Sequence, residues 1–302
     1  MAGDLFAGRT ETLFKDHKNM NGIYHDISHV VSCGNVYHGH GGVDAFGKKF
    51  TSSNALSMRY YFIQSYKLHR KYGRTIWLHA HNKFYPFVHD FADLWAPGEE
   101  QAGDFANSPF FYYLEKIAME EYQSAWNAEI RGVGIQMISQ QERVSGLMQE
   151  LRPLRDKISN PVTLQHSVAA ALLHDFKVWE SAPRLKEKHP LGRVWTIKSK
   201  LNMDKAEFHG YWVSSAVRSD DPAIYCSWYS WKPGSAPLKR LLVAVNTSRK
   251  EKAAKLVIDW KQLGIDQSKV KITELWSGKE LKADDLKTMV IQPHCFALIE
   301  MK

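Results

Sequence analysis

The chain has 302 residues, of which 44% are hydrophobic and 12% aromatic, and its 40 Lys and Arg outnumber its 32 Asp and Glu, giving a net charge of +8. This composition is too apolar for a disordered protein and too mixed for a fibrous one. No run approaches 18 apolar residues, the first residues lack the layout of a secretory signal, and the three cysteines form no CxxC pair. These features exclude a membrane-spanning helix and a zinc-thiolate motif, and they leave the compartment unknown: extracellular or periplasmic if a longer precursor carries a signal.

The basic excess lies in residues 181–302. Its lysines stand singly between strand-like residues, as in KAAKLVIDWK, and they form no block of like charges. Lysines on strand faces and edges also discourage edge-to-edge pairing. We therefore expect no nucleic-acid partner, and no membrane partner either.

Short apolar runs alternate with longer amphipathic stretches over the first 180 residues. The opening ETLFKDHKNMNGIYHD predicts a helix that leads into a strand. Such alternation is typical of βαβ units and a parallel sheet. The predicted strands are 22–25, 75–79, 92–95, 133–138 and 176–179, and the predicted helices are 53–72, 110–128 and 163–173.

Beyond residue 190 the pattern changes to strand-like runs separated by turn residues, from VWTIKSKL to CFALIEM. Several alternate with period two, which predicts an all-β module, a sandwich. The boundary falls in the polar stretch Ser181–Gly192, so we predict an α/β domain over 1–185 and a C-terminal β-sandwich domain over 186–302. Five βα units do not close a parallel barrel, which needs eight strands. The first domain is therefore an open doubly wound sheet or the later part of a barrel.

Polar side chains follow several of the predicted strands at the carboxyl end, where parallel α/β proteins collect their reactive groups. Tyr24, His25 and Asp26 end the first strand, His79, His81 and Asn82 the second, and Glu99 and Glu100 follow the third.

Asp26 and Glu99 suit the cleavage of a glycosidic bond. That reaction needs two acids facing one pocket, one to attack or stabilise the sugar carbon and one to protonate the leaving oxygen. Glu100 competes with Glu99 for the second role. An Asp after a strand also caps loops, and a loop Glu is often only solvated. Nearby rings, Tyr24 among them, could stack on sugars, although most aromatic residues serve packing.

The HxH pairs His38–His40 and His79–His81 offer a different interpretation. Alternate residues of a strand face the same side, so each pair could hold a metal with Asp26 as a carboxylate ligand. His38 and His40 lie in the glycine-rich stretch VSCGNVYHGHGG, which has no preset geometry. Imidazoles that bind sugar hydroxyls would give the same sequence pattern, and we assign no metal and no cofactor.

The sequence also carries a family likeness. The run GIYHDISHVVSCGN…GHGGVDAFGKK, followed by IWLHAHN, FADLWAPGEEQ, RGVGIQMISQ and ALLHDFKVW, resembles the later strands of glycoside-hydrolase-like (β/α)8 proteins near glycoside hydrolase family 123. The tail LLVAVNTSRKEKAAKLVIDWKQLGI…MVIQPHCFALIEM resembles the β-sandwich that follows the barrel in many glycosidases.

The resemblance implies that the five strands are the fourth to eighth of a TIM-type barrel and that the chain is its carboxyl-terminal portion. Asp26 would then be the nucleophile and Glu99 the acid/base, as on the same strands of α-galactosidase-like retaining enzymes. His79 and His81 would face the substrate. Family 123 enzymes use an adjacent Asp and Glu, whereas Ile27 follows Asp26 here. A missing barrel half or a second copy of the chain would cover the open strand edges.

The sequence thus predicts a glycosidase, a hydrolase of carbohydrate metabolism acting on O-glycosidic bonds, which an incomplete chain could leave inactive. The alternatives are a metal-dependent hydrolase that uses the HxH pairs and a non-catalytic carbohydrate-binding remnant. The expected catalytic residues are Asp26, Glu99 and Glu100, and the expected substrate-binding residues are Tyr24, His25, His38, His40, His79, His81 and Asn82.

Overall fold

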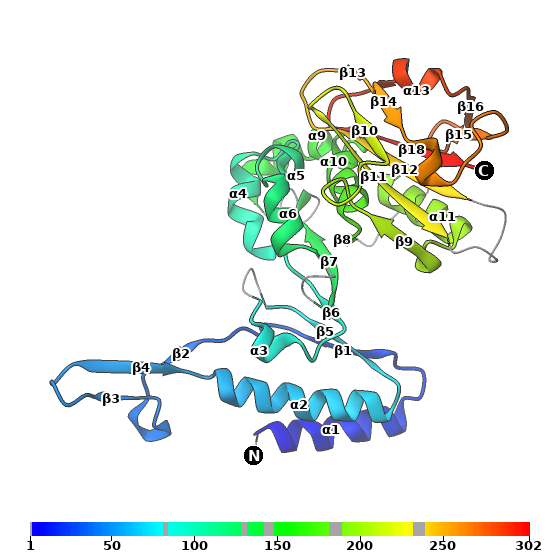
Figure 1. Cartoon of the computed structure of the whole chain (residues 1–302). Helices are drawn as coiled ribbons and strands as arrows, with labels where there is room; N and C mark the ends of the chain where they lie inside the picture. The colour runs from blue at the N-terminus through cyan, green and yellow to red at the C-terminus, as the bar shows by residue number, and fades with distance from the viewer. Residues whose placement is uncertain (1, 81–83, 128–131, 142–147, 181–188, 232–238) are drawn as a thin grey trace. The chain divides into compact units, whose positions relative to one another are not determined.

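A computed structural model describes residues 2–80, 84–127, 132–141, 148–180, 189–231 and 239–302 (Figure 1). The chain divides into two compact units. The first comprises Met1–Glu100 and Ala128–Ile138, and the second comprises Gln101–Asn127 and Ser139–Lys302. This grouping does not follow the predicted division at residue 185, which stays a prediction. Across the described ranges, no helix has the length and apolarity needed to cross a membrane.

A parallel sheet of five strands has the order β1-β5-β6-β7-β8. Strand β1 pairs with β5, β5 with β6, and β6 with β7, all in parallel. The five predicted strands are confirmed to within two residues at either end, whereas closure into a barrel is not confirmed. The strands are β1 (Gly22–His25), β5 (Thr75–Leu78), β6 (Leu94–Trp95), β7 (Gly134–Ser139) and β8 (Lys177–Glu180).

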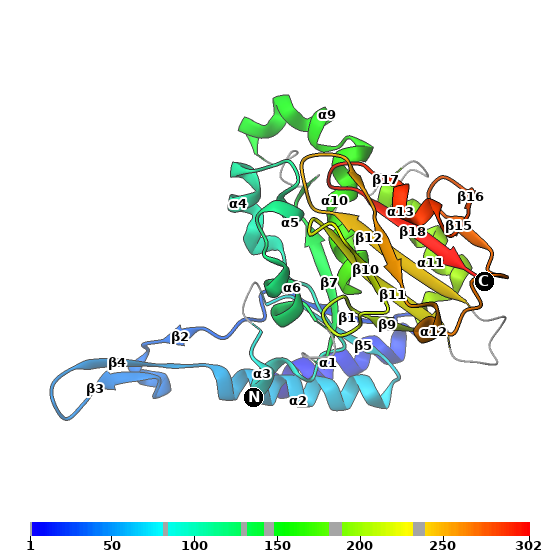
Figure 2. The ribbon, with the colours of Figure 1, turned by 45° about the horizontal axis from the view of Figure 1, so that its top comes forward.

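Helices α1 (Ala2–Asp16) and α2 (Ala55–Lys71) lie side by side in the first unit (Figures 1 and 2). The predicted helix 53–72 is confirmed as α2, which buries Phe62 and Leu68. Gly73, with φ +61°, follows its C-cap and lets the chain turn into β5. The short helix α3 (Pro86–His89) packs against α2.

A three-stranded antiparallel sheet forms an arm of the first unit, residues 31–53, with the order β2-β4-β3. Its elements are β2 (Ser32–Cys33), the 3-10 turn η1 (Val36–His38), β3 (Gly41–Val43) and β4 (Lys49–Ser53). Both views show the arm extending beyond the end of α2. Every residue of β4 is exposed, and Tyr37 and Phe46 are each 95% exposed. The arm therefore has almost no hydrophobic core of its own.

The second unit begins with short helices where one long helix over 110–128 was predicted. These are α4 (Ala102–Asn107), α5 (Tyr112–Glu115) and α6 (Met119–Ala125). Ala118 is extended between α5 and α6. The buried hydroxyl of Tyr122 donates to the Tyr113 carbonyl at 2.7 Å, which in a continuous helix would accept from the backbone four residues on. The predicted single helix is thus wrong: the chain is extended at Ala118, and α5 packs against α10 (Pro161–His174).

A six-stranded antiparallel sheet has the order β16-β15-β18-β12-β11-β9. Helix α10 (Pro161–His174), predicted as 163–173, packs against β11 and β12 and is buried on almost every side. The smaller pairs β10–β14 and β13–β17 add their apolar residues to the core beside the sheet. The strands are β9 (Ala206–His209), β10 (Val217–Ser219), β11 (Ile224–Trp231), β12 (Arg240–Asn246), β13 (Lys252–Ala253), β14 (Leu256–Ile258), β15 (Ile272–Glu274), β16 (Lys279–Leu281), β17 (Val290–Ile291) and β18 (Phe296–Met301).

The run VWTIKSKL, predicted as a strand, is helical. It forms most of α11 (Pro190–Leu201). Pro190 occupies the first turn and the His189 ring accepts from the Leu191 amide, while Leu191 and Val194 are buried at helical spacing. These start signals outweigh the β-branched residues. The remaining helical turns are η2 (Glu99–Gln101), η3 (Gln149–Leu154), α9 (Arg155–Ile158), η4 (Met203–Lys205), α12 (Trp260–Leu263) and α13 (Asp285–Thr288).

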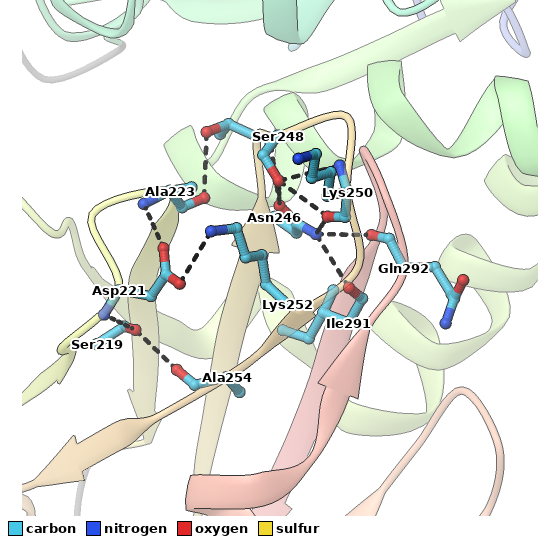
Figure 3. A network of polar contacts seen from close by, with 11 residues as sticks. Ser219, Asp221, Ala223, Asn246, Ser248, Lys250, Lys252, Ala254, Ile291 and Gln292 are labelled. Atoms are coloured by element: carbon cyan, nitrogen blue, oxygen red, sulfur yellow. Dashed lines mark hydrogen bonds and ion pairs between the residues drawn. The ribbon is translucent and has the colours of Figure 1, made fainter.

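Asn246, at the end of β12, organises a polar network in the second unit (Figure 3). Its side chain is fully buried. The amide nitrogen donates to the carbonyl of Lys250 at 2.8 Å and to that of Ile291 at 3.0 Å. The amide oxygen accepts from the backbone and hydroxyl of Ser248 at 2.9 and 2.8 Å. One side chain thus joins the turn after β12 to β17.

Candidate functional site

The loops that follow β1, β5 and β6 continue the hydrogen bonding of the parallel sheet. The His79 amide donates to the His25 carbonyl at 2.9 Å, and the Ser28 amide donates to the His79 carbonyl at 2.8 Å. Beyond β6, the Ala96 amide donates to the Leu78 carbonyl at 2.7 Å. These hydrogen bonds fix the backbone of the loops relative to the sheet. They therefore also fix the Cα positions from which the loop side chains extend.

Asp26 follows β1 and is held by several donors. Its Oδ1 accepts from the Ile27 amide at 2.9 Å, from His79 Nδ1 at 2.7 Å and from the Tyr24 hydroxyl at 3.4 Å. The hydrogen bond from His79 is the main cause that lowers the pKa of Asp26, although the side chain is 57% exposed. Ile27 has φ +50°, a costly conformation for a β-branched residue, and it turns the chain directly after Asp26.

His79 lies between two carboxylates. It comes directly after β5, the strand between β1 and β6, and it is 1% exposed. Its Nδ1 contacts Asp26, and its Nε2 lies 3.4 Å from Glu99 Oε2. The Tyr24 ring is stacked on it, with 6.2 Å between ring centroids. Its burial argues against the expected direct contact with substrate, because the carboxylates it contacts are far more exposed.

Glu99 and Glu100 diverge within one turn. Glu99 reaches His79 and keeps 27% of its side chain exposed, whereas Glu100 Oε2 accepts from the Gly98 amide at 3.0 Å. Gly98 has φ +115°, and a Cβ there would meet the Ile138 carbonyl oxygen at 2.6 Å. Only glycine fits this close approach, which places the two glutamates. Of the two, Glu99 has the contact expected of a partner for Asp26.

His25, expected to bind substrate, points to the other side of the sheet. Side chains alternate along a strand, so Tyr24 and Asp26 share one face and His25 takes the opposite one. It is 5% exposed, and its Nδ1 lies 2.8 Å from the Tyr61 hydroxyl of α2, beside the ring of Phe62. Burial lowers its pKa to about 4. The His25 side chain therefore packs between β1 and α2, on the face opposite to Asp26.

Two further predicted substrate-binding residues, His38 and His40, belong to the arm. His40 lies on the arm, with its backbone carbonyl accepting from Ser52. The backbone of His38 ends η1, and His81 and Asn82 lie outside the described residues. Among the residues that are described, no group of three or more His, Cys, Asp and Glu side chains could hold a metal ion.

Sequence reasoning missed two hollows in the second unit, of about 870 and 820 Å³. Both are lined by Gln165 and Trp276, and neither contains a predicted site residue. The Arg193 guanidinium lies 4.3 Å from the centre of the Trp276 ring. Arg193 directly precedes the run predicted as a strand and belongs to α11, so the error over α11 hid this arrangement.

Comparison with known proteins supports the likeness noted in the sequence. Residues 190–283 match the family described as glycoside hydrolase 123, C-terminal domain. No curated protein matches the chain. A pullulanase from Anoxybacillus sp. LM18-11 is 10% identical with a TM-score of 0.37, covering 86% of this chain and 49% of its own. A candidate alpha-galactosidase/melibiase from Bacteroides fragilis is 11% identical with a TM-score of 0.31, covering 86% and 68%.

Residues 190–283 are therefore similar to the C-terminal domain of a glycoside hydrolase family. The family match covers part of the second unit and supports a glycosidase-like role in general terms. Because both TM-scores lie below 0.5, the two solved structures do not establish a shared fold. The chain spans about half the length of the pullulanase.

Proposed function

We propose that this protein hydrolyses O-glycosidic bonds with Asp26 and Glu99. The observation that carries the proposal is the contact of both carboxylates with opposite nitrogens of His79, although they come from loops separated by 72 residues of sequence. The reaction requires at least two carboxyl groups at one site. The carboxyl end of a parallel sheet is where α/β enzymes place such groups.

Asp26 takes the role of nucleophile or transition-state stabiliser. Its lowered pKa keeps it negatively charged, as a group facing a developing oxocarbenium ion must be. Glu99 takes the acid/base role and donates its proton to the leaving oxygen as the bond from that oxygen to the sugar carbon breaks. Water then supplies the hydroxyl to the sugar carbon and the proton that restores Glu99.

The test is turnover of a panel of aryl glycosides. We expect D26N to lower kcat/KM by about 10³-fold or more on every substrate that the protein cleaves, because both roles of Asp26 need the charge. D16N, the same substitution at an exposed position at the end of α1, is the matched control. Wild-type rates in D26N would contradict the assignment.

Glu99 is tested through the leaving group. E99Q should lose about 10²–10⁴-fold on a glycoside with a poor leaving group, and much less on a dinitrophenyl glycoside, which departs without a proton. E100Q should retain most activity, because Glu100 contacts the Gly98 amide. The reverse pattern would assign the acid to Glu100. Sugar binding without any turnover would favour the carbohydrate-binding alternative, and activity lost on chelation would favour the metal-dependent one.

A further inference from the structure

His79 differs from its two carboxylate neighbours in burial. The ring is 1% exposed, whereas the side chains of Asp26 and Glu99 are 57% and 27% exposed. Its backbone amide and carbonyl are both used by the loop after β1, since they bond the His25 carbonyl and the Ser28 amide. The backbone of His79 is therefore held by these hydrogen bonds, while both ring nitrogens contact the two carboxylates.

We infer that His79 is a positioning residue that holds Asp26 through Nδ1 and Glu99 through Nε2, so that one rigid ring sets the arrangement of the two carboxylates. Its catalytic consequence rests on the function proposed above. The arrangement itself does not, and it can be tested without substrate.

The chemistry of the contacts gives the direction of the hydrogen bonds. An ionised carboxylate only accepts, so the 2.7 Å contact to Asp26 requires a proton on Nδ1. That donation is the main cause of the lowered pKa of Asp26. At Nε2 the 3.4 Å distance to Glu99 Oε2 is an ion-pair contact, which does not define a donor and an acceptor. Within the described ranges, the ring contacts Asp26 after β1, Glu99 in η2 and the Tyr24 ring of β1.

Two substitutions separate the halves of the ring. The amide nitrogen of Asn can occupy the place of Nδ1, so H79N keeps a donor for Asp26 and loses the contact with Glu99. The amide nitrogen of Gln reaches one bond further, to the place of Nε2, so H79Q keeps the contact with Glu99 and loses the donor to Asp26.

The measurement is the titration of the Asp26 carboxyl carbon by NMR, without substrate. We expect the Asp26 pKa to stay low in wild type and in H79N, and to rise toward its ordinary range in H79Q, where the Ile27 amide and the Tyr24 hydroxyl remain as donors. If H79Q titrates like wild type, His79 does not hold Asp26 and the inference is overturned, whatever the protein hydrolyses.

If H79Q does not fold, the nitrogen-15 shifts of His79 in the wild-type protein decide the question. We expect a protonated Nδ1, with its shift altered in D26N, and an unprotonated Nδ1 would overturn the inference. Given a cleaved substrate, H79Q should also move the acidic limb of the kcat/KM profile to higher pH, which a purely structural role would not do. Absence of any cleavable glycoside would count against the proposed function alone.

Discussion

Four buried histidines make the stability of this protein sensitive to acid. Desolvation lowers the pKa of His25, His89 and His174 to about 4 and that of His166 to about 3. Each stays neutral in the folded chain while the unfolded chain binds a proton near pH 6.5, so stability is lost as pH falls from 6.5 toward these values. Between pH 7 and pH 5 we expect a loss of about 2 kcal/mol per histidine.

Urea unfolding at pH 7 and pH 5 measures this loss. H174Q removes one buried imidazole and should reduce the pH dependence by about a quarter, while H17Q, at an exposed position, should leave it unchanged. Equal free energies of unfolding at the two pH values would show that these rings are protonated as easily in the folded state as in the unfolded one.

For single residues, the sequence predicted which strand end carries a side chain better than it predicted the direction in which the side chain points. Asp26 and Glu99 could be placed from strand ends, because the carboxyl ends of parallel strands meet at one edge. The sequence could not show that His25 and Asp26 face opposite sides, since that depends on which face of β1 packs against α2. The burial of His79 was equally hidden, although its place on the strand between β1 and β6 was a signal that it contacts both neighbours.

At the scale of elements, the side chain of Asn246 supplies hydrogen bonds where the regular strand pairing of β12 ends. Its amide nitrogen meets backbone carbonyls of Lys250 and Ile291, and those carbonyls lose their donor in N246D, where a carboxylate faces them. We expect N246D to lower the free energy of unfolding by about 2–4 kcal/mol.

Chemical denaturation of N246D and S248A compares the two ends of this network. S248A removes only a hydroxyl on a half-exposed turn and should cost about 1 kcal/mol or less. A similar small cost in N246D would mean that water satisfies the carbonyls and that the turn does not depend on the amide.

Elements with strong periodicity and clear ends were predictable, and those set by tertiary contacts were not. Helix α2 has apolar residues at helical spacing, with Phe62 and Leu68 buried, and a glycine directly after its C-cap. The break between α5 and α6 lies at the extended Ala118, and the buried Tyr122 hydroxyl bridges it to the Tyr113 carbonyl, which no local pattern reveals. In α11 the β-branched residues suggested a strand, and the Pro190 start signal was the feature that should have decided the assignment.

At the scale of the whole molecule, the arm of residues 31–53 is the described segment with the least support. Its strand β4 is exposed along its length, and Lys48 and Lys49 lie at the turn into that strand. Isolated short antiparallel ribbons are marginally stable in water. We therefore expect brief trypsin digestion to cut at Lys48 or Lys49 before it cuts within α2 or β12, with mass spectrometry of the first fragments as the measurement.

K48Q and K49Q together should remove that early cut and leave the rest of the digestion pattern unchanged. An arm that survives long digestion would show that it is covered in solution, by a second copy of the chain or by another polypeptide. The alternating pattern of strands and helices was enough to predict the parallel sheet. It could not predict what covers the sheet edge at β1, because strand and helix periodicity does not show which surfaces pack together.

The order of the six-stranded sheet has a consequence for biosynthesis. The strand β12 is paired on one side by β11 and on the other by β18, a strand that is made much later. Leu241–Asn246 are all buried in the finished sheet. About 50 residues separate β12 from β18, so a ribosome adding roughly 5–20 residues per second leaves that apolar edge open for several seconds. During that interval the nascent chain exposes an unpaired apolar strand edge. A chaperone that binds this edge would prevent the chain from pairing with other chains.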